Sequence, residues 1–384
     1  ARYSVPYLAH ATMEPMNATA LFKDGTLEVW SGTQDGLGAR AYCAEAAKLP
    51  LEKVTFHLMQ MGGGFGRRLP GYFNFLDYAV KTAMAMPGIP VKLLFTREED
   101  MQHDYYRPNV VSRFRAALDQ KGAPLASVND YTTEDDPYPE AHIVYAIPNQ
   151  AIGAAKLTTS IPTGPWRSVE ASWHGFFIES FMDELAHEAG ADPYAYRRAL
   201  LAHAPRHRAV LELAAQQAGW GTALPKGRAR GIAIFESFQT IVAEVAEVEV
   251  DAQGALTVHR ITAAVDAGTP VNPDGLRAQV EGGIIFGLSA ALNGDITIDK
   301  GRVVQANFPD YEMVKLAGCP KIDVHLITSD GPYGGGGEPG VPPLAPALAN
   351  AVFAATGRRI RDLPIRSRDL AATIAPAPPK KAAG

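Results

Sequence analysis

The stretch GPYGGGGEPGVPPLAPALANAVFAATG, residues 331–357, places four consecutive glycines directly before Glu338 and Pro339. The segment PKIDVHLITSD (320–330) predicts a strand before the glycines, and LAPALANAVFAATG (344–357) predicts a helix after them. A helix dipole favours an acid at its N-terminus by about 0.3–1 kcal/mol, which would account for the carboxylate but not for the glycines. Partial desolvation beside the apolar VPPLAP segment would instead suit a general base, so both roles stay open for Glu338.

The same loop also contains a pattern found in dinucleotide-binding proteins. Gly335, Gly337 and Gly340 satisfy G-x-G-x-x-G after a predicted strand. Glu338 would repel a pyrophosphate, and Pro339 lacks an N–H group that could donate to it. A nicotinamide-dependent dehydrogenase using these three glycines therefore stays an alternative, as does a scaffold without an active site.

A second glycine run, MQMGGGFGRR (59–68), follows another predicted strand. Glycine permits unusual backbone angles and lets backbone N–H groups approach an anion or oxo ligand closely. The run is not a P-loop, because Gly-Lys-Ser/Thr is absent, and Arg67 stands where a dinucleotide fingerprint needs its third glycine. A tight turn and a ligand-facing loop are the two interpretations.

Composition sets limits on the class of protein. The 384 residues are 47% hydrophobic and 20% charged, with a net charge of −5, so we expect a globular chain of two domains that does not bind nucleic acid. Cys43 and Cys319 are the only cysteines, whereas an iron–sulfur cluster needs about four thiolates. His203 and His207 are separated by Pro205, so no metal-ligating set of side chains is predicted.

The beginning of the chain and its apolar runs bear on its origin. No apolar run reaches the roughly 18 residues of a membrane span, and no signal peptide is recognisable. The chain opens with Ala1 rather than Met, which indicates a removed leader or a segment of a larger product.

The pattern along the chain predicts an α+β (mixed α/β) fold. Strand-like segments alternate with turns up to about residue 165, amphipathic helices follow from 170, and strands and helices alternate again after 231. The polar segment 221–231 predicts a boundary between a first domain, 1–225, and a second, 226–370, with a disordered tail at 371–384. We expect Asp183, Glu184 and the basic segment GRRIRDLPIRSR (357–368) to lie on solvated faces.

Five ordered motifs together resemble the molybdenum-binding subunit of the xanthine oxidase/aldehyde oxidase family. They are SGTQDG (31–36), MGGGFGRR (61–68), GPWRSVEASWHGFFIESFMDELA (164–186), DAGTPVNPDGLRAQVEGGIIFGLSAAL (266–292) and GGGGEPGVPPLAPALANAVFAATG (334–357). The double Arg, ATMEPMNATA (11–20) and PWRSV look most like the C-terminal part of the bacterial isoquinoline 1-oxidoreductase β-subunit branch. The resemblance implies two elongated molybdopterin-binding domains with mixed sheets and packed helices.

The resemblance also implies roles for individual residues. Gln34 would bond an oxo ligand of molybdenum, and Gly64, Phe65 and Gly66 would form the loop over the metal, with the Gly66 N–H facing that ligand. Trp166 and Arg167 would lie beside the metal, Gln279 and Gly337 would contact the cofactor, and Glu338 would be the catalytic base. No side chain would ligate the metal, because the dithiolene of the pterin holds it.

The implied activity is hydroxylation of an aldehyde or N-heteroaromatic carbon with oxygen from water. The implied cofactor is molybdopterin with molybdenum, in its cytosine dinucleotide form, and the [2Fe-2S] clusters would lie on a separate small subunit. The family's Gly-Gln-Gly loop is absent from this chain. We therefore expect a companion chain carrying the N-terminal part of the subunit. The resemblance also implies a cytochrome c acceptor and a periplasmic location, with the cytoplasm as the alternative.

Overall fold

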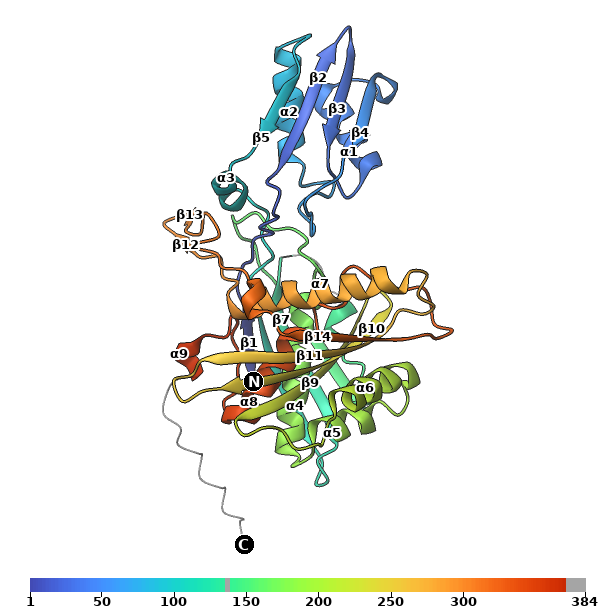
Figure 1. The fold of residues 1–384 in the computed structure, drawn as a ribbon, viewed down its shortest axis with the longest axis vertical. Coiled ribbons are helices and arrows are strands. Elements are labelled where there is room, and N and C mark those ends of the chain that lie inside the picture. Colours follow the sequence, from blue (N-terminus) through green and yellow to red (C-terminus); the bar gives the residue numbers. More distant parts are fainter. Residues whose placement is uncertain (135–138, 371–384) are drawn as a thin grey trace.

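The computed structural model describes residues 1–134 and 139–370, so the expected disordered tail at 371–384 lies outside the described residues. Figure 1 shows an elongated molecule, in which a small α/β unit is joined through several chain segments to a larger unit. Each of the three four-stranded sheets combines antiparallel strands with one parallel pair, and helices pack against the sheets. The predicted mixed α/β class is confirmed.

The small unit is a four-stranded sheet with two helices on one face. The strand order is β4-β3-β2-β5, and only β3 and β4 run parallel. A separate core of buried side chains, such as Leu27, Val29, Phe75, Leu76 and Val80, holds this unit together. Its elements are β2 (Asn17–Lys23), β3 (Thr26–Ser31), α1 (Gly36–Ala47), β4 (Val54–Leu58), α2 (Asn74–Ala85) and β5 (Val91–Leu94).

The large unit contains two four-stranded sheets. One has the order β1-β6-β7-β8, from β1 (Arg2–Val5), β6 (Val110–Leu118), β7 (Pro124–Thr133) and β8 (Asn149–Lys156). The other has the order β14-β11-β10-β9, from β9 (Arg228–Ser237), β10 (Thr240–Val250), β11 (Leu256–Asp266) and β14 (Lys321–Ile327). Its helices are α3 (Arg97–Gln102), α4 (Ala171–Glu188), α5 (Pro193–Leu200), α6 (Pro205–Ala218), α7 (Pro273–Leu292), α8 (Leu344–Thr356) and α9 (Ser367–Leu370), and a short hairpin joins β12 (Ile298–Asp299) to β13 (Arg302–Val303).

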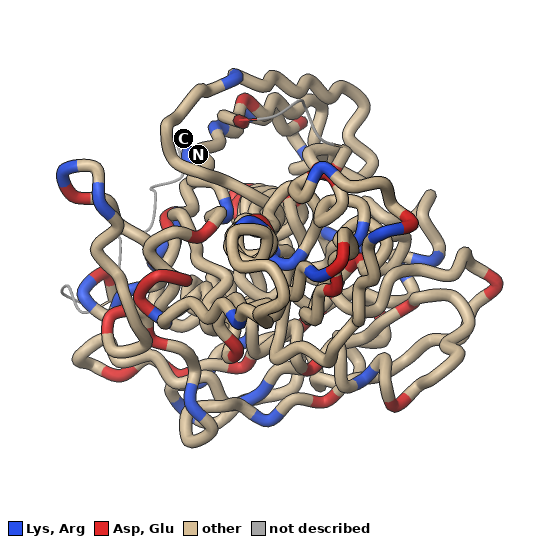
Figure 2. The backbone as a smooth tube through the Cα atoms, turned by 90° about the horizontal axis from the view of Figure 1, so that it is seen from above, with Lys and Arg blue, Asp and Glu red and all other residues tan. Residues whose placement is uncertain are grey.

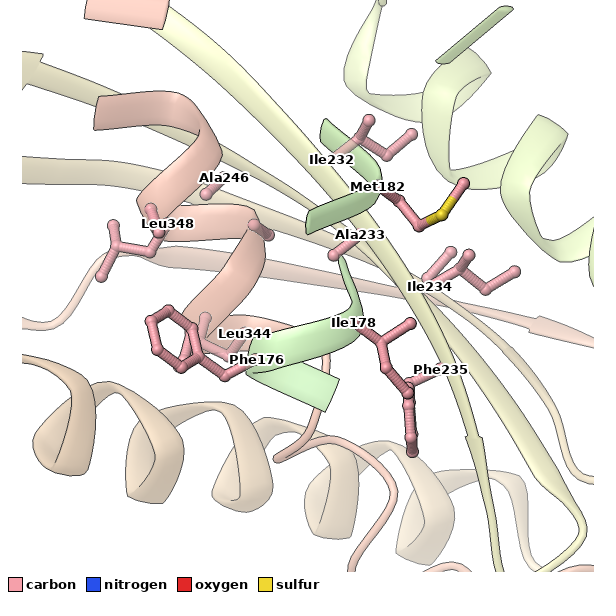
Figure 3. Close-up of a cluster of buried hydrophobic side chains, with 14 of the residues drawn as sticks. Phe176, Ile178, Met182, Ile232, Ala233, Ile234, Phe235, Ala246, Leu344 and Leu348 are labelled. Atoms are coloured by element: carbon pink, nitrogen blue, oxygen red, sulfur yellow. The ribbon is translucent and has the colours of Figure 1, made fainter. Parts of the chain in front are cut away.

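Helix α4 lies between the two sheets, because it contacts β6, β9 and α8. This position explains why α4 is apolar around most of its circumference and buried along most of its length. Figure 3 shows Phe176, Ile178 and Met182 of this helix packed with Ile232 to Phe235 of β9 and with Leu344 and Leu348 of α8. Helices α4 and α8 therefore form the central layer of the large unit.

The hydrophobic core groups the chain differently from the predicted domains. One continuous core joins Tyr3, Phe114 and Phe176, which precede residue 225, to Ile232 and Leu344, which follow it. The two regions interdigitate because α4 packs on β9 and α8. The predicted boundary between two domains at 225/226 thus stays a prediction from the sequence.

The predicted solvation of Asp183 and Glu184 is wrong. The Asp183 side chain is 7% exposed and pairs with Arg359 at 2.6 Å, and Glu184 pairs with Arg361 at 2.6 Å. The basic segment 357–368 thus returns to α4 and pairs with its acids. This pairing joins residues about 180 positions apart along the chain, so local sequence patterns do not reveal it.

The surface charge is mixed in sign. Figure 2 shows Lys and Arg interspersed with Asp and Glu over the described part of the chain. Among the helices that the structure describes, none combines the length and the apolar character that crossing a membrane requires.

Candidate functional site

Arg167 brings four separate segments together. Its Nε donates to the Gly337 carbonyl oxygen at 2.8 Å, and its Nη2 donates to the main-chain and side-chain oxygens of Gln279 at 3.1 and 3.3 Å. The guanidinium carbon lies 5.8 Å from the ring centroid of Phe65 and 5.7 Å from that of Phe286. The second glycine run, α7, the loop before α8 and the loop before α4 therefore meet at one buried cation.

Glu338 is held by the residue that follows Arg167. The Ser168 N–H donates to Glu338 Oε1 at 2.9 Å, and the Ser168 hydroxyl donates to the Glu338 carbonyl oxygen at 2.7 Å. Among the described residues, no hydrogen bond reaches the other carboxylate oxygen, Oε2, and the side chain is partly exposed. This geometry fixes the orientation of the carboxylate and leaves one oxygen free to accept a proton.

The loop at 62–68 is folded tightly around the Gln34 side chain. The Gln34 Oε1 accepts from the Gly66 N–H at 3.0 Å and from the Arg68 N–H at 3.3 Å. The resemblance predicted that the Gly66 N–H faces a metal ligand, whereas in the structure this N–H is bonded to Gln34. Because Oε1 faces two donors, the exposed carboxamide presents its nitrogen as the remaining donor.

Two glycines in this loop have no room for a side chain. A Cβ at Gly66, whose φ is +113°, would lie 1.7 Å from the Pro165 carbonyl oxygen. A Cβ at Gly64 would lie 2.5 Å from Gln34 Oε1. The glycines therefore let the loop approach both Gln34 and the segment that carries Arg167.

A buried ionic network lies behind the loop. The Asp104 carboxylate accepts from the His10 N–H at 2.7 Å, contacts His10 Nδ1 at 2.9 Å and pairs with Arg67 Nε at 3.0 Å. Burial disfavours ionisation of Asp104, but His10 and Arg67 outweigh it and hold the pKa of this carboxyl below its usual range. His10 Nε2 lies 2.8 Å from the Pro165 carbonyl oxygen, which links the network to the loop before α4.

Trp166 does not lie open to a ligand. Its ring is 3% exposed, stacks on Phe286 at 4.6 Å between centroids, and donates from Nε1 to the Ala9 carbonyl oxygen at 3.3 Å. The tryptophan thus supports the Arg167 loop from within the core, beside Leu8 and Val341.

The glycine loop before α8 does not have the geometry of a dinucleotide turn. The segment Thr328–Pro343 separates the end of β14 from the start of α8, and the sheet is mixed rather than doubly wound. A Cβ at Gly340 would lie 2.8 Å from the Val280 carbonyl oxygen, so this glycine serves close packing on α7. The Gly335 N–H is already bonded to the Phe238 carbonyl oxygen at 2.8 Å.

The electrostatics of the site centre on Arg167. Burial lowers the pKa of its guanidinium, and the nearby Glu338 carboxylate partly offsets that effect. The part of the chain that the structure describes contains no cluster of three or more His, Cys, Asp or Glu side chains suited to a metal ion. A metal at this site would therefore need to arrive with ligands of its own.

Sequence reasoning missed Ser168, His10 and Phe286. Ser168 and the next residue, Val169, have φ values of +76° and +39°, which are unusual for residues with side chains and indicate a constrained loop. The sequence gives no direct sign of this backbone conformation. His10 contacts Pro165, 155 positions away, and Phe286 contacts Trp166, 120 positions away, so only the fold reveals that they belong to the site.

Comparisons with known proteins agree with this arrangement. Two family models, both described as molybdopterin cofactor-binding domains, match residues 1–201 and 182–320. The chain is 32% identical to a membrane-bound aldehyde dehydrogenase [pyrroloquinoline-quinone] of Gluconacetobacter polyoxogenes, over 96% of this chain and 53% of that protein. It is also 32% identical to the isoquinoline 1-oxidoreductase subunit beta of Brevundimonas diminuta, over 93% of this chain and 48% of that protein.

The fold has solved counterparts. The crystal structure of quinoline 2-oxidoreductase from Pseudomonas putida 86 superimposes with a TM-score of 0.84 at 15% identity, covering 96% of this chain and 75% of that chain. The chain spans about half the length of the aldehyde dehydrogenase and of the isoquinoline 1-oxidoreductase subunit beta. On these matches, the chain belongs to the molybdopterin cofactor-binding family.

Proposed function

We propose that this chain forms the catalytic part of a molybdenum hydroxylase acting on an aldehyde or N-heteroaromatic carbon. The observation that carries the proposal is the carboxylate of Glu338, which Ser168 holds by one oxygen next to the Arg167 cluster. The names of the relatives, an aldehyde dehydrogenase and an isoquinoline oxidoreductase, support the two substrate classes.

The residues around Glu338 fit a metal that carries its own organic ligand. They offer hydrogen-bond donors and acceptors but no metal-ligating cluster within the described chain. We propose that molybdopterin, in its cytosine dinucleotide form, is held by Gln34, Gly64, Phe65, Gly66, Arg167, Gln279 and Gly337, with the buried Trp166 behind them. When bound, this cofactor would supply the oxygen that reaches the substrate and would accept the two electrons of the C–H bond that breaks.

The residues of the chain then have distinct tasks. Glu338 Oε2 accepts the proton released when the attacking hydroxyl oxygen bonds to the electron-poor carbon, while Ser168 keeps Oε1 fixed. Arg167 bonds the Gly337 carbonyl and the Gln279 side chain. These bonds fix the position of Glu338, the proposed base, relative to the loop at 62–68. Trp166 supports this arrangement from the core through its stack on Phe286.

Partner chains follow from what this chain does not contain. Cys43 is buried and Cys319 is partly exposed, and two thiols cannot bind a [2Fe-2S] cluster. We propose that a small iron–sulfur subunit takes the electrons, that a cytochrome c receives them and that the complex works in the periplasm. The remaining half of the relatives' length would be supplied by a companion segment that completes the cofactor pocket.

The test is metal, cofactor and chain analysis of the native complex. The purified complex is assayed for molybdenum, pterin nucleotide and pyrroloquinoline quinone, because the name of one relative includes that quinone. About one molybdenum per chain with cytosine nucleotide and a separate iron–sulfur subunit would support the proposal.

Other results would contradict it. Pyrroloquinoline quinone without molybdenum would assign the redox chemistry to the quinone. Absence of both, together with tight nicotinamide binding, would instead favour the dehydrogenase that uses Gly335, Gly337 and Gly340. Cell fractionation of the same strain, with recovery in the cytoplasm, would overturn the periplasmic assignment.

A further inference from the structure

A group of exposed apolar side chains lies at one edge of the small unit. Leu37 is 82% exposed, Leu58 63%, Met59 50% and Met61 39%, and nearby Met13 is 76% exposed. We call these five residues the β4 patch. Side chains of this size and exposure, gathered in one place, mark a surface that another molecule covers.

The members of the β4 patch are linked by close contacts. A Cβ at Gly36 would lie 3.7 Å from a methyl carbon of Leu58, so the start of α1 lies against the end of β4. The Gly62 N–H, next to Met61, donates to the Glu14 carboxylate at 2.7 Å, and Glu14 follows Met13. The five side chains therefore belong to one region of the surface.

Strand β4 adds a backbone argument. It lies at the end of its sheet and, among the described strands, pairs only with β3. An edge strand with exposed apolar side chains is prone to pair with other chains unless it is covered. A partner polypeptide would satisfy this edge as well as the side chains.

The β4 patch is continuous with the candidate cofactor site. Met61 directly precedes the loop at 62–68, and a Cβ at Gly32, two residues before Gln34, would lie 2.6 Å from Met61 Cβ. Whatever covers the patch also borders Gln34 and the Phe65–Gly66 turn. A partner at this position would therefore lie beside the candidate cofactor site.

We propose that the β4 patch docks the segment corresponding to the half of the curated relatives that this chain does not match. The two matches span 96% and 93% of this chain but only 53% and 48% of the relatives. About half of each relative therefore has no counterpart in this chain and is available to cover the β4 patch. The inference rests on the proposed function, because it assigns that segment to the rim of the same cofactor site.

The patch suits an oxidation footprint, because three of its five residues are methionines. The native complex is treated with dilute hydrogen peroxide, and sulfoxide formation is followed by peptide mass analysis. Met86, 43% exposed at the far end of α2, is the internal reference. We expect Met13, Met59 and Met61 to oxidise about tenfold more slowly than Met86 in the complex, because a packed interface excludes water.

A photo-reactive amino acid at position 58 then identifies the covering chain. Cross-linking to the companion segment supports the inference, and cross-linking to the iron–sulfur subunit, or free oxidation of the three methionines, overturns it. Molybdenum is measured on the same material. Free methionines in a molybdenum-loaded complex refute the docking site alone, whereas absence of molybdenum refutes the proposed function.

A pair of variants tests the patch energetically. Leu58→Glu places a charge in the proposed interface and should reduce recovery of the companion segment at least about tenfold. Leu316→Glu is the control, because Leu316 is 94% exposed and lies outside the patch. Equal recovery with both variants would contradict the inference, and continued protection of the buried Met16 from oxidation would show that Leu58→Glu has folded.

Discussion

At the residue scale, the hydrogen bond from Ser168 to Glu338 Oε1 sets the orientation of the proposed base. A carboxylate held by one oxygen can accept a proton at the other without first reorganising. Ser168 itself has a left-handed backbone conformation, which places its N–H and its hydroxyl on the same glutamate.

Replacing Glu338 separates catalysis from cofactor binding. Glu338→Gln keeps the shape and the bond from Ser168 but cannot accept the proton, so turnover should fall by about 10²–10⁴-fold. Molybdenum content should stay unchanged, as measured by elemental analysis beside steady-state kinetics. Glu45→Gln, at an exposed position of α1, is the control, and near-full activity of Glu338→Gln would remove the base assignment.

His174 predicts how stability depends on pH. Its ring is fully buried on α4, 4.8 Å from the Tyr131 ring centroid, and neither ring nitrogen has a hydrogen-bond partner among the described residues. Burial lowers its pKa from 6.5 to about 3. The unfolded chain therefore binds a proton below pH 6.5 that the folded chain does not bind. As the pH is lowered from 6.5 toward about 3, the free energy of unfolding falls by roughly 1.4 kcal/mol per pH unit.

A variant isolates this contribution. His174→Leu should flatten the dependence of unfolding on pH between about 6.5 and 4, as measured by urea denaturation at several pH values. His203→Leu removes an exposed histidine and serves as the control. If both variants keep the slope of the unchanged protein, His174 is not the source of the acid sensitivity.

At the scale of elements, two glycines of the same loop region differ in their surroundings. Gly66 and Gly71 both have positive φ, at +113° and +93°, but only Gly66 would bring a Cβ against a neighbour, the Pro165 carbonyl oxygen. The difference between the two sites is therefore a steric contact, since the backbone strain of an alanine is similar at both.

Alanine substitutions at Gly71 and Gly66 should distinguish the cost of backbone strain from the cost of a steric contact with the Pro165 carbonyl oxygen. Gly71→Ala should cost roughly 1 kcal/mol from backbone strain alone. Gly66→Ala should cost more and should also displace the loop from Gln34 and Arg167, with loss of bound cofactor. Thermal unfolding and molybdenum content provide the two measurements, and equal effects of the two variants would refute the contact argument.

At the scale of the whole molecule, two arginines of the C-terminal segment form ion pairs with acids of α4. Arg359 pairs with Asp183, and the two side chains are 14% and 7% exposed, whereas Arg361 pairs with Glu184 at 42% and 15% exposure. Removing one partner of a buried pair leaves an uncompensated charge, but an exposed pair is screened by water.

The two arginines should differ in their effect on stability. Arg359→Met should lower the free energy of unfolding by about 2–4 kcal/mol, because Asp183 loses its closest cation. Arg361→Met should cost less than about 1 kcal/mol, because water screens much of that pair. Chemical denaturation of both variants gives the comparison, and a larger loss for Arg361→Met would contradict this assignment.

The sequence predicted those elements whose signals are local. The strand at 320–330 and the helix at 344–357 follow from local patterns, and the structure confirms them as β14 and α8. The glycine runs and Glu338 identified the candidate site because they depart from what an ordinary turn requires.

What the sequence alone determined is therefore the class of fold, most of its elements and the family to which its motifs belong. The tertiary structure decided which residues meet: Ser168 with Glu338, Arg167 with Gln279 and Gly337, and the acids of α4 with the C-terminal arginines. Helix and strand signals lie within a few neighbouring residues, whereas these contacts join positions 112 to 177 apart, and only packing of the core brings them together.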